Sequence, residues 1–133
     1  MRPTYQTEFG EFGNCMSACI ASILDIPLRD IPNFTLYKDR WFPEMRNWLI
    51  ARGYEPIYHY QIDRIDWDNF PACISGWENL EFLPYYMHNG KSPRGYGHAT
   101  VGYKGKMIHD PHPEGGGVAV EDYCFLIKSR HAE

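Results

Sequence analysis

The chain has 133 residues, of which 44% are hydrophobic and 16% aromatic, so residues 1–133 have the composition of a single globular domain and not of a disordered segment. The formal net charge of −4 argues against a general attraction to nucleic acid or to an acidic membrane surface. No apolar run approaches the roughly 20 residues of a membrane-spanning helix, and residues 1–6 lack the apolar stretch of a secretory signal. We therefore expect a cytoplasmic protein whose cysteines are reduced.

Two helices are expected in the first half of the chain. The first covers about residues 15–25, and Asn14 before it is a residue type that commonly caps a helix N-terminus. The second covers about residues 43–52, and Gly53 follows its end. Residues 26–43 contain three prolines and are expected to be irregular.

Two short strands and a long loop are expected in the middle of the chain. Residues 54–60 have the pattern of an edge strand, because Pro56 lacks the N–H group that a central strand needs. Residues 70–76 are largely apolar and are expected to form another short strand. Residues 77–96, which are rich in aromatic residues, proline and glycine, are expected to form a loop.

The last third of the chain predicts a β-hairpin and a final strand. Residues 99–103 and 106–109 flank the two-residue loop Lys104-Gly105, and residues 123–128 have the composition of the last strand. Because helices come first and antiparallel strands follow, the sequence predicts the α+β class, with an N-terminal helix packed on an antiparallel sheet.

Three residues point to a catalytic site. Cys15 stands at the start of the first predicted helix, where free N–H groups and the positive end of the helix dipole stabilise a thiolate. His98 opens the hairpin, and Asp110 follows it 12 positions later (110 − 98), so the two antiparallel strands can bring them together. A protonated His98 would lower the pKa of Cys15 and then protonate the leaving group, while Asp110 orients the ring. The pattern predicts a cysteine hydrolase.

The motifs around these residues resemble the papain-like cysteine peptidase superfamily, nearest to its bacteriocin-processing-peptidase-like branch and to small stand-alone proteins of phages and bacteria. The resemblance is carried by Gly13 to Pro27, by Gly97-His98-Ala99, and by His109-Asp110-Pro111-His112-Pro113. Gln6 lies nine positions before Cys15 (15 − 6), a slightly longer spacing than is usual in that branch.

The resemblance implies a papain-like fold over about residues 1–128, with Gln6 and the Cys15 N–H group as oxyanion donors. It implies that the substrate is a peptide or protein, that no cofactor is needed, and that the protein works in the cytoplasm of a bacterium or of a phage-infected host cell. Cleavage of a leader peptide is not implied, because neither a transporter segment nor a leader substrate is attached. No oligomeric state is implied.

Three alternative interpretations concern the same residues. Zinc could bind Cys15, His98, Asp110 and His112 by ligand type, but the sequence lacks paired metal-ligand spacings, so no metal site is expected. The fold could serve as a binding module without activity, for example a phage-encoded factor that sequesters a host component. The same thioester could also pass its acyl group to an amine, which would make the protein an acyl transferase.

Several other residues are assigned to structural or lining positions. The remaining cysteines are expected in the core, and His109 on the surface or in a loop. The glycines at 115–117 are expected to form a flexible loop. The residues that could form a wall of the substrate cleft are Trp77, Tyr85 and Tyr96.

Overall fold

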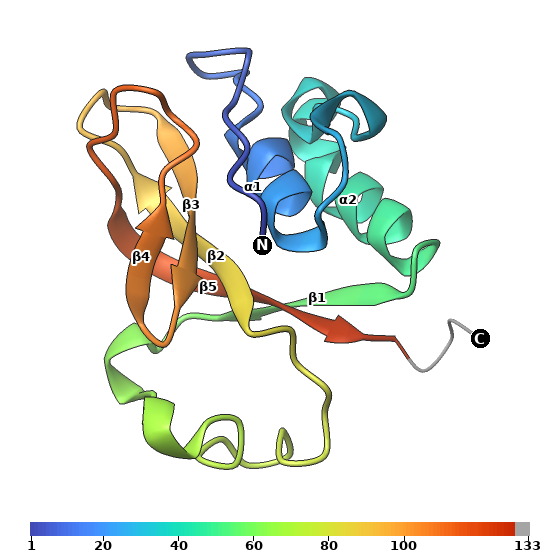
Figure 1. Cartoon of the computed structure of the whole chain (residues 1–133), viewed down its shortest axis with the longest axis vertical. Coiled ribbons are helices and arrows are strands. Elements are labelled where there is room, and N and C mark those ends of the chain that lie inside the picture. Colours follow the sequence, from blue (N-terminus) through green and yellow to red (C-terminus); the bar gives the residue numbers. More distant parts are fainter. Residues whose placement is uncertain (130–133) are drawn as a thin grey trace.

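Two helices pack on a five-stranded antiparallel sheet in the computed structural model, which describes residues 1–129 (Figure 1). The α+β class expected from the sequence is therefore confirmed. The order of the strands across the sheet is β1-β5-β2-β3-β4. The elements are α1 (Cys15–Leu24), α2 (Trp41–Ile50), β1 (Tyr54–His59), β2 (Tyr85–Lys91), β3 (Gly97–Tyr103), β4 (Lys106–His109) and β5 (Ala119–Lys128).

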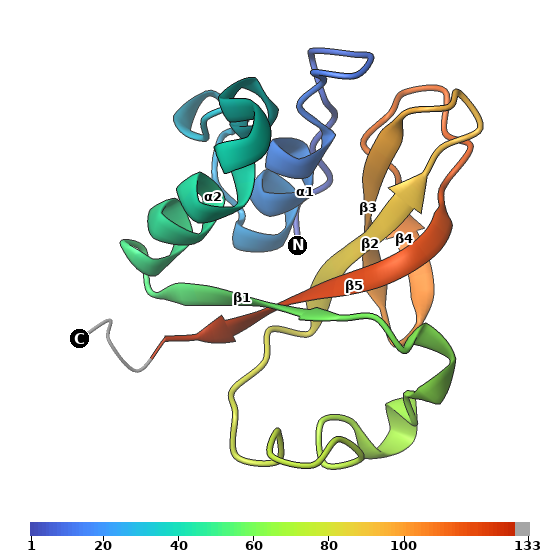
Figure 2. The ribbon, with the colours of Figure 1, turned by 180° about the vertical axis from the view of Figure 1, so that it is seen from behind.

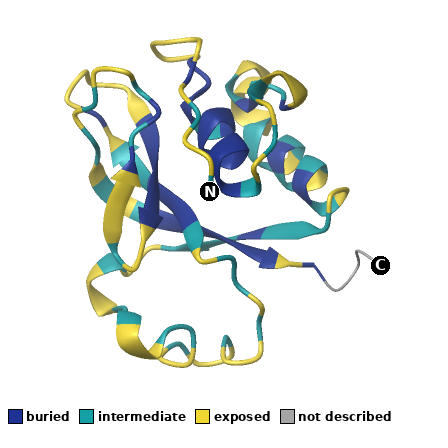
Figure 3. Ribbon diagram, viewed as in Figure 1, coloured by how far each residue is buried: buried dark blue, intermediate teal, exposed yellow. Residues whose placement is uncertain are grey.

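The main core lies between α1 and the middle of the sheet. Ile20 and the small residues Ala18 and Ala21 are fully buried in α1, so the helix backbone can approach the strands closely. Cys124 and Leu126 of β5 belong to the same core. Figure 3 shows α1 and the central strands as the most deeply buried part of the molecule.

A second, aromatic cluster covers the other face of the sheet. Tyr123 and Phe125 alternate with Cys124 and Leu126 along β5, so their rings point away from α1. Residues 60–84 supply the partners of this cluster and lie on the side of the sheet away from the helices (Figures 1 and 2). The middle of the sheet is thus buried on both faces, whereas the edge strand β4 is largely exposed.

The hairpin and the edge strand follow the expectations from the sequence. Lys104 and Gly105 both have positive φ, 48° and 84°, as a type I′ hairpin turn requires. A bulge lies in β4, because Val101 pairs with His109 while Gly102 pairs with Met107. At the opposite end of the sheet, β1 pairs only with β5, so its assignment as an edge strand is also confirmed.

Two expectations for the middle of the chain are wrong. Residues 70–76 form turns and not a strand, because the Phe70 ring inserts into the aromatic cluster while Cys73 is exposed. The expected loop at 77–96 contains β2, a central strand that pairs with both β3 and β5. The final strand also begins earlier than expected, at Ala119.

Candidate active site

A short hydrogen bond joins His98 to Asp110. Nε2 of the His98 ring lies 2.7 Å from Oδ1 of Asp110, and the two side chains are only 5% and 6% exposed. β3 carries the histidine near its start, and the aspartate follows the end of β4. The contact expected from the hairpin is confirmed. An ionised Asp110 accepts a hydrogen bond from the Nε2–H group of His98. In the neutral imidazole the lone pair therefore lies on Nδ1.

Two backbone N–H groups hold the Asp110 carboxylate in place. His112 N–H donates to Oδ1 at 2.9 Å, and Gly117 N–H donates to Oδ2 at 2.8 Å. Burial acts to raise the pKa of Asp110, but the hydrogen bonds from His98, His112 and Gly117 outweigh it, and the pKa lies below its usual value. The glycines at 115–117 were expected to be a flexible loop, yet Gly117 is one of the groups that position Asp110.

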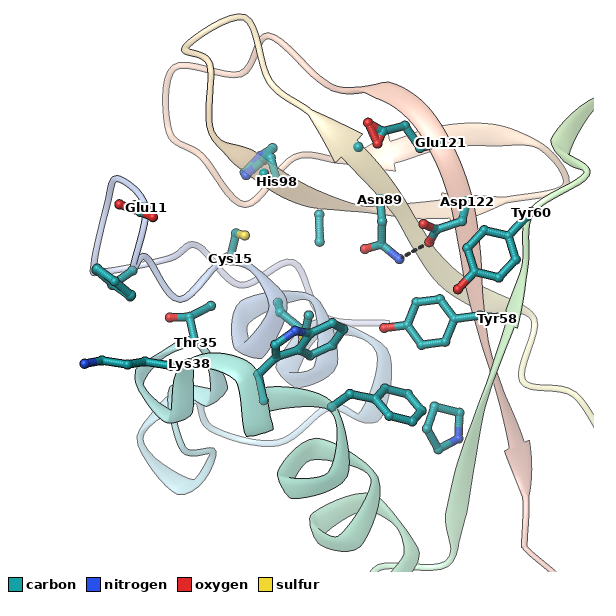
Figure 4. Close-up of a pocket in the computed structure, with 18 residues that line it drawn as sticks. Glu11, Cys15, Thr35, Lys38, Tyr58, Tyr60, Asn89, His98, Glu121 and Asp122 are labelled. Carbon is teal, nitrogen blue, oxygen red and sulfur yellow. Dashed lines mark hydrogen bonds between the residues drawn. The ribbon is translucent and has the colours of Figure 1, made fainter.

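Cys15 opens α1 and lines the same cavity as His98 (Figure 4). Its sulfur interacts with the backbone N–H groups of Met16, of Cys15 itself and of Ala99. Because Ala99 directly follows His98 in β3, this contact places the sulfur beside the strand that carries the histidine. Figure 4 shows the sulfur pointing toward that strand.

Burial sets the ionisation of both groups. It raises the pKa of the Cys15 thiol; the three N–H groups offset part of this rise, and the charge of Asp110 adds to it. Burial also lowers the pKa of His98, and the hydrogen bond and charge of Asp110 offset only part of this effect. The resting pair is therefore a neutral thiol and a neutral imidazole. The expected lowering of the Cys15 pKa is wrong, because the site is too buried to favour two charges.

The Cys15 sulfur and the His98 ring are not joined by a hydrogen bond in the described residues. Among residues 1–129 the His98 ring makes one hydrogen bond, to Asp110, and none to the Cys15 sulfur. The approach of Nδ1 to the sulfur therefore stays a prediction. Catalytic pairs are often loosely aligned before a substrate binds and tighten only in the complex.

Gln6 is buried beside the site but does not line the cavity. Its backbone N–H donates to the carbonyl of Pro111 at 3.0 Å, next to Asp110 in the chain. Its Nε2 donates to the carbonyl of Glu8 at 2.9 Å. A side-chain amide carries two N–H donors, and this bond uses one of them. The role of Gln6 as an oxyanion donor stays a prediction.

Asn14 organises the loop before Cys15 instead of capping α1. Its Oδ1 accepts the N–H groups of Thr7 and Glu8, each at 2.9 Å, and it makes no side-chain hydrogen bond to the helix. A side chain at Gly13 would place Cβ 2.8 Å from the Glu8 carbonyl oxygen, so this close turn requires glycine. The expected helix cap is therefore wrong. Asn14 ties the N-terminal loop to the residue before the thiol.

The cavity in front of Cys15 and His98 has a volume of about 750 Å³. It lies between the first turns of the helices and the sheet. The aromatic residues that line it are Phe12, Trp41, Phe42, Tyr58 and Tyr60, and its polar and charged residues include Glu11, Lys38, Asn89, Glu121 and Asp122.

The aromatic residues expected at the cleft lie elsewhere. Trp77 packs in the cluster on the other face of the sheet. Tyr85 packs against Tyr103 with ring centroids 5.4 Å apart. Tyr96 is exposed and does not line the cavity. The sequence of β1 and the residue after it could have indicated the lining residues. Alternate residues from Pro56 to Tyr60 face one side of an extended chain, and these residues line the cavity.

His109 is buried, contrary to expectation. Its Nε2 lies 2.7 Å from the carbonyl oxygen of Thr4, and its ring packs against Tyr5. The N-terminal segment covers this end of β4, and the bulge shifts the alternation of side chains along the strand. Cys19 and Cys124 are buried as expected, whereas Cys73 is exposed.

Residues 1–129 hold neither a metal-type cluster nor a membrane-spanning helix. In this part of the chain no three or more His, Cys, Asp or Glu side chains are grouped to hold a metal ion. Nor is any helix of these residues both long and apolar enough to cross a membrane.

Comparison with known proteins gives no relative: no family model, no curated protein and no solved structure matches the chain. The interpretation of the site therefore depends on its geometry and chemistry alone.

Proposed function

We propose that this chain is a papain-like cysteine hydrolase that cleaves a peptide, isopeptide or other amide bond. Cys15 is the nucleophile, His98 the general acid and base, and Asp110 the residue that orients the ring. The observation that carries the proposal is the 2.7 Å hydrogen bond from His98 to a buried, ionised Asp110, at the edge of a cavity that Cys15 also lines. A histidine with only a structural role needs neither this carboxylate nor the neighbouring thiol and cavity.

The first half of the reaction forms a thioester. Nδ1 of the neutral His98 accepts the thiol proton while the Cys15 sulfur attacks the carbonyl carbon, and the carbonyl oxygen takes up the electron pair. When this intermediate collapses, the carbon–nitrogen bond breaks and His98 passes its proton to the departing amine. Asp110 remains ionised throughout and stabilises the imidazolium that exists between these two transfers.

The second half restores the thiol. A water molecule gives a proton to His98 and attacks the thioester carbon. The carbon–sulfur bond then breaks, the acid is released, and His98 returns the proton to Cys15. An amine in place of water would give acyl transfer from the same intermediate, so this activity is a second outcome of the same site.

A non-enzymatic binding module is the alternative of a different class. The observation in its favour is the raised pKa of Cys15, since a buried thiol without reactivity would show the same shift.

Turnover of an activated ester and of a panel of fluorogenic peptide amides tests the proposal. The wild type should turn over at least the ester, and Cys15→Ala should lose this activity. The matched control is Cys73→Ala, which removes an exposed thiol that does not line the cavity and should retain the activity. An amide product formed when an amine is added would identify acyl transfer. Absence of turnover in the wild type, or equal turnover by Cys15→Ala, would favour the binding module.

A further inference from the structure

Aromatic rings form the wall of the cavity that α2 and β1 contribute. Trp41 and Phe42 lie in the first turn of α2, and their ring centroids are 6.5 Å and 5.5 Å from that of Tyr58 in β1. Tyr60 stacks on Tyr58 at 6.4 Å. Such a surface can cover the aliphatic stem of a long side chain, and its ring faces attract a positive charge.

Asn89 and Asp122 lie at the same end of the cavity as Tyr58 and Tyr60, on the neighbouring strands β2 and β5 (Figure 4). Nδ2 of Asn89 donates to Oδ1 of Asp122 at 2.9 Å. This bond fixes the amide so that its oxygen, an acceptor, is the atom turned away from Asp122. Figure 4 shows that oxygen on the side of Asn89 that faces the cavity.

A buried hydroxyl at this end has no good partner. The Tyr58 hydroxyl has no nitrogen or oxygen partner among the described residues, and its hydrogen-bonding neighbour is the Cys124 thiol, a weak hydrogen-bonding group. Figure 4 shows the hydroxyl directed into the cavity. A buried hydroxyl that has only a weak partner is poorly satisfied, and a ligand in the cavity would supply the stronger partner that the chain lacks.

The charges around the cavity are predominantly negative. Among the described residues, three carboxylates line it, those of Glu11, Glu121 and Asp122, against the single ammonium group of Lys38. The acceptor oxygens at the Asp122 end need hydrogen-bond donors, and a purely apolar ligand would leave them unpaired. A positively charged group with several N–H donors would neutralise the carboxylate charge and donate hydrogen bonds to the acceptor oxygens.

We propose that this end of the cavity is a specificity subsite for a cationic side chain of the substrate, that of lysine or arginine. The stem of the side chain lies on Trp41, Phe42 and Tyr58, and its charged head binds Asp122 and the amide oxygen of Asn89. Asp122 and Asn89 therefore determine specificity and take no part in the chemical step. The inference rests on the proposed function, because it places the scissile bond at the Cys15 end of the same cavity.

Matched covalent probes test this subsite. Each probe is an acetylated dipeptide chloromethyl ketone, in which the Cys15 sulfur displaces chloride to form a carbon–sulfur bond and the thiol proton passes to His98. One residue of the dipeptide is alanine and the other is lysine or its neutral isostere norleucine, and each pair is made in both orders. The rate of modification of Cys15 is measured by mass spectrometry and divided, for each protein, by its rate with iodoacetamide.

We expect the wild type to prefer lysine over norleucine by about tenfold or more in at least one of the two orders. Asp122→Asn keeps an oxygen that can accept from Asn89 but removes the charge, so the preference should fall to near one. Raising the ionic strength should also weaken the preference. The matched control, Asp68→Asn, changes an exposed carboxylate that does not line the cavity and should keep the full preference.

Each of the other outcomes overturns a defined part of the account. Equal rates for lysine and norleucine, or faster norleucine, in both orders would overturn the cationic subsite and leave Cys15 as the nucleophile. A lysine preference that survives in Asp122→Asn would overturn the assignment of the residues. Failure of every probe and of iodoacetamide to modify Cys15 would overturn the proposed function and the subsite with it.

Discussion

The Cys15 thiol and the His98 imidazole lie at one end of the cavity, and both residues are more than nine-tenths buried. Burial raises the pKa of the first and lowers the pKa of the second, so neither carries a charge at rest. In the proposed reaction, proton transfer to His98 must then accompany the attack of the sulfur on the substrate. Asp110 is ionised at rest, and in the proposed reaction its charge stabilises the imidazolium that forms on His98.

Substitutions at His98 and Asp110 should reduce kcat/KM in a fixed order. His98→Ala removes the proton carrier and should lower kcat/KM by about 100-fold or more. Asp110→Ala should lower kcat/KM less than His98→Ala does, since the base remains and only its orientation is lost. Asp110→Asn should lower kcat/KM least, because the amide oxygen can still accept a hydrogen bond from Nε2 of His98. The measurement is kcat/KM of the purified variants on one substrate that the wild type turns over, with circular dichroism to check the fold.

Full activity of Asp110→Ala on such a substrate, with no activity of Cys15→Ala, would contradict the orienting role. Asp110 would then be a turn residue that accepts the N–H groups of His112 and Gly117, and the site would be a Cys–His dyad.

The residues of the proposed catalytic site carry signals in the sequence, whereas the residues of the proposed subsite do not. Cys15 and His98 are marked by local signals, a helix start and the start of a hairpin strand. Asn89 and Asp122 meet only because β2 and β5 are neighbours in the sheet. The residue pattern within either strand does not predict this pairing, because Asn89 and Asp122 are far apart in the sequence.

At the level of elements, the hairpin was predictable because its turn has a strong local signature in Lys104-Gly105. β2 gives no such signature. Tyr86 and His88 face the aromatic cluster while Met87 faces the main core, so consecutive side chains are buried on both faces. The alternation of polar and apolar residues that marks a half-buried strand is therefore absent.

Two glycines of β3 should respond very differently to alanine. A Cβ at Gly102 would lie 2.1 Å from Nε2 of His88, in a fully packed part of the sheet. Gly102→Ala should therefore lower the free energy of unfolding by about 1–3 kcal/mol. At Gly97 no atom lies within 4 Å of such a Cβ. Gly97→Ala should therefore change the free energy of unfolding by less than about 0.5 kcal/mol. Urea denaturation of both variants checks the difference, and similar values for the two would show that His88 does not pack on Gly102.

For the whole molecule, the sheet separates two cores, and the candidate site forms where the N-terminal segment and α1 meet the hairpin, which is distant from them in sequence. The N-terminal segment, α1 and the hairpin supply Gln6, Cys15, His98 and Asp110. Backbone hydrogen bonds from Arg2 to Ser22 and from Gln6 to Pro111 hold the N-terminal segment against α1 and the hairpin. Stability of the whole domain is thus a condition for the geometry of the site.

The buried His88 should make the domain less stable in mild acid. Burial lowers the pKa of His88 to about 4, and its Nε2 lies 3.2 Å from the Tyr86 hydroxyl. The unfolded chain, in which histidine titrates near 6.5, then binds more protons than the folded one, so stability falls as the pH decreases from about 6.5 toward 4.

Between pH 7 and pH 5 the free energy of unfolding should fall by about 1–2 kcal/mol more for the wild type than for His88→Phe, which cannot take up this proton. Urea denaturation at the two pH values gives the comparison, and protonation of other groups is common to both proteins. An identical loss in the two proteins would mean that His88 titrates normally in the folded state.

The central claim is that Cys15 carries the acyl group during turnover. The most direct measurement is to quench the wild type with acid during its reaction with the activated ester and to locate the acyl group by peptide mass spectrometry. The account predicts a thioester on Cys15 that forms and decays during turnover, and none on Cys19, Cys73 or Cys124. An acyl group found only on the exposed Cys73, or turnover without any acyl group on Cys15, would contradict it.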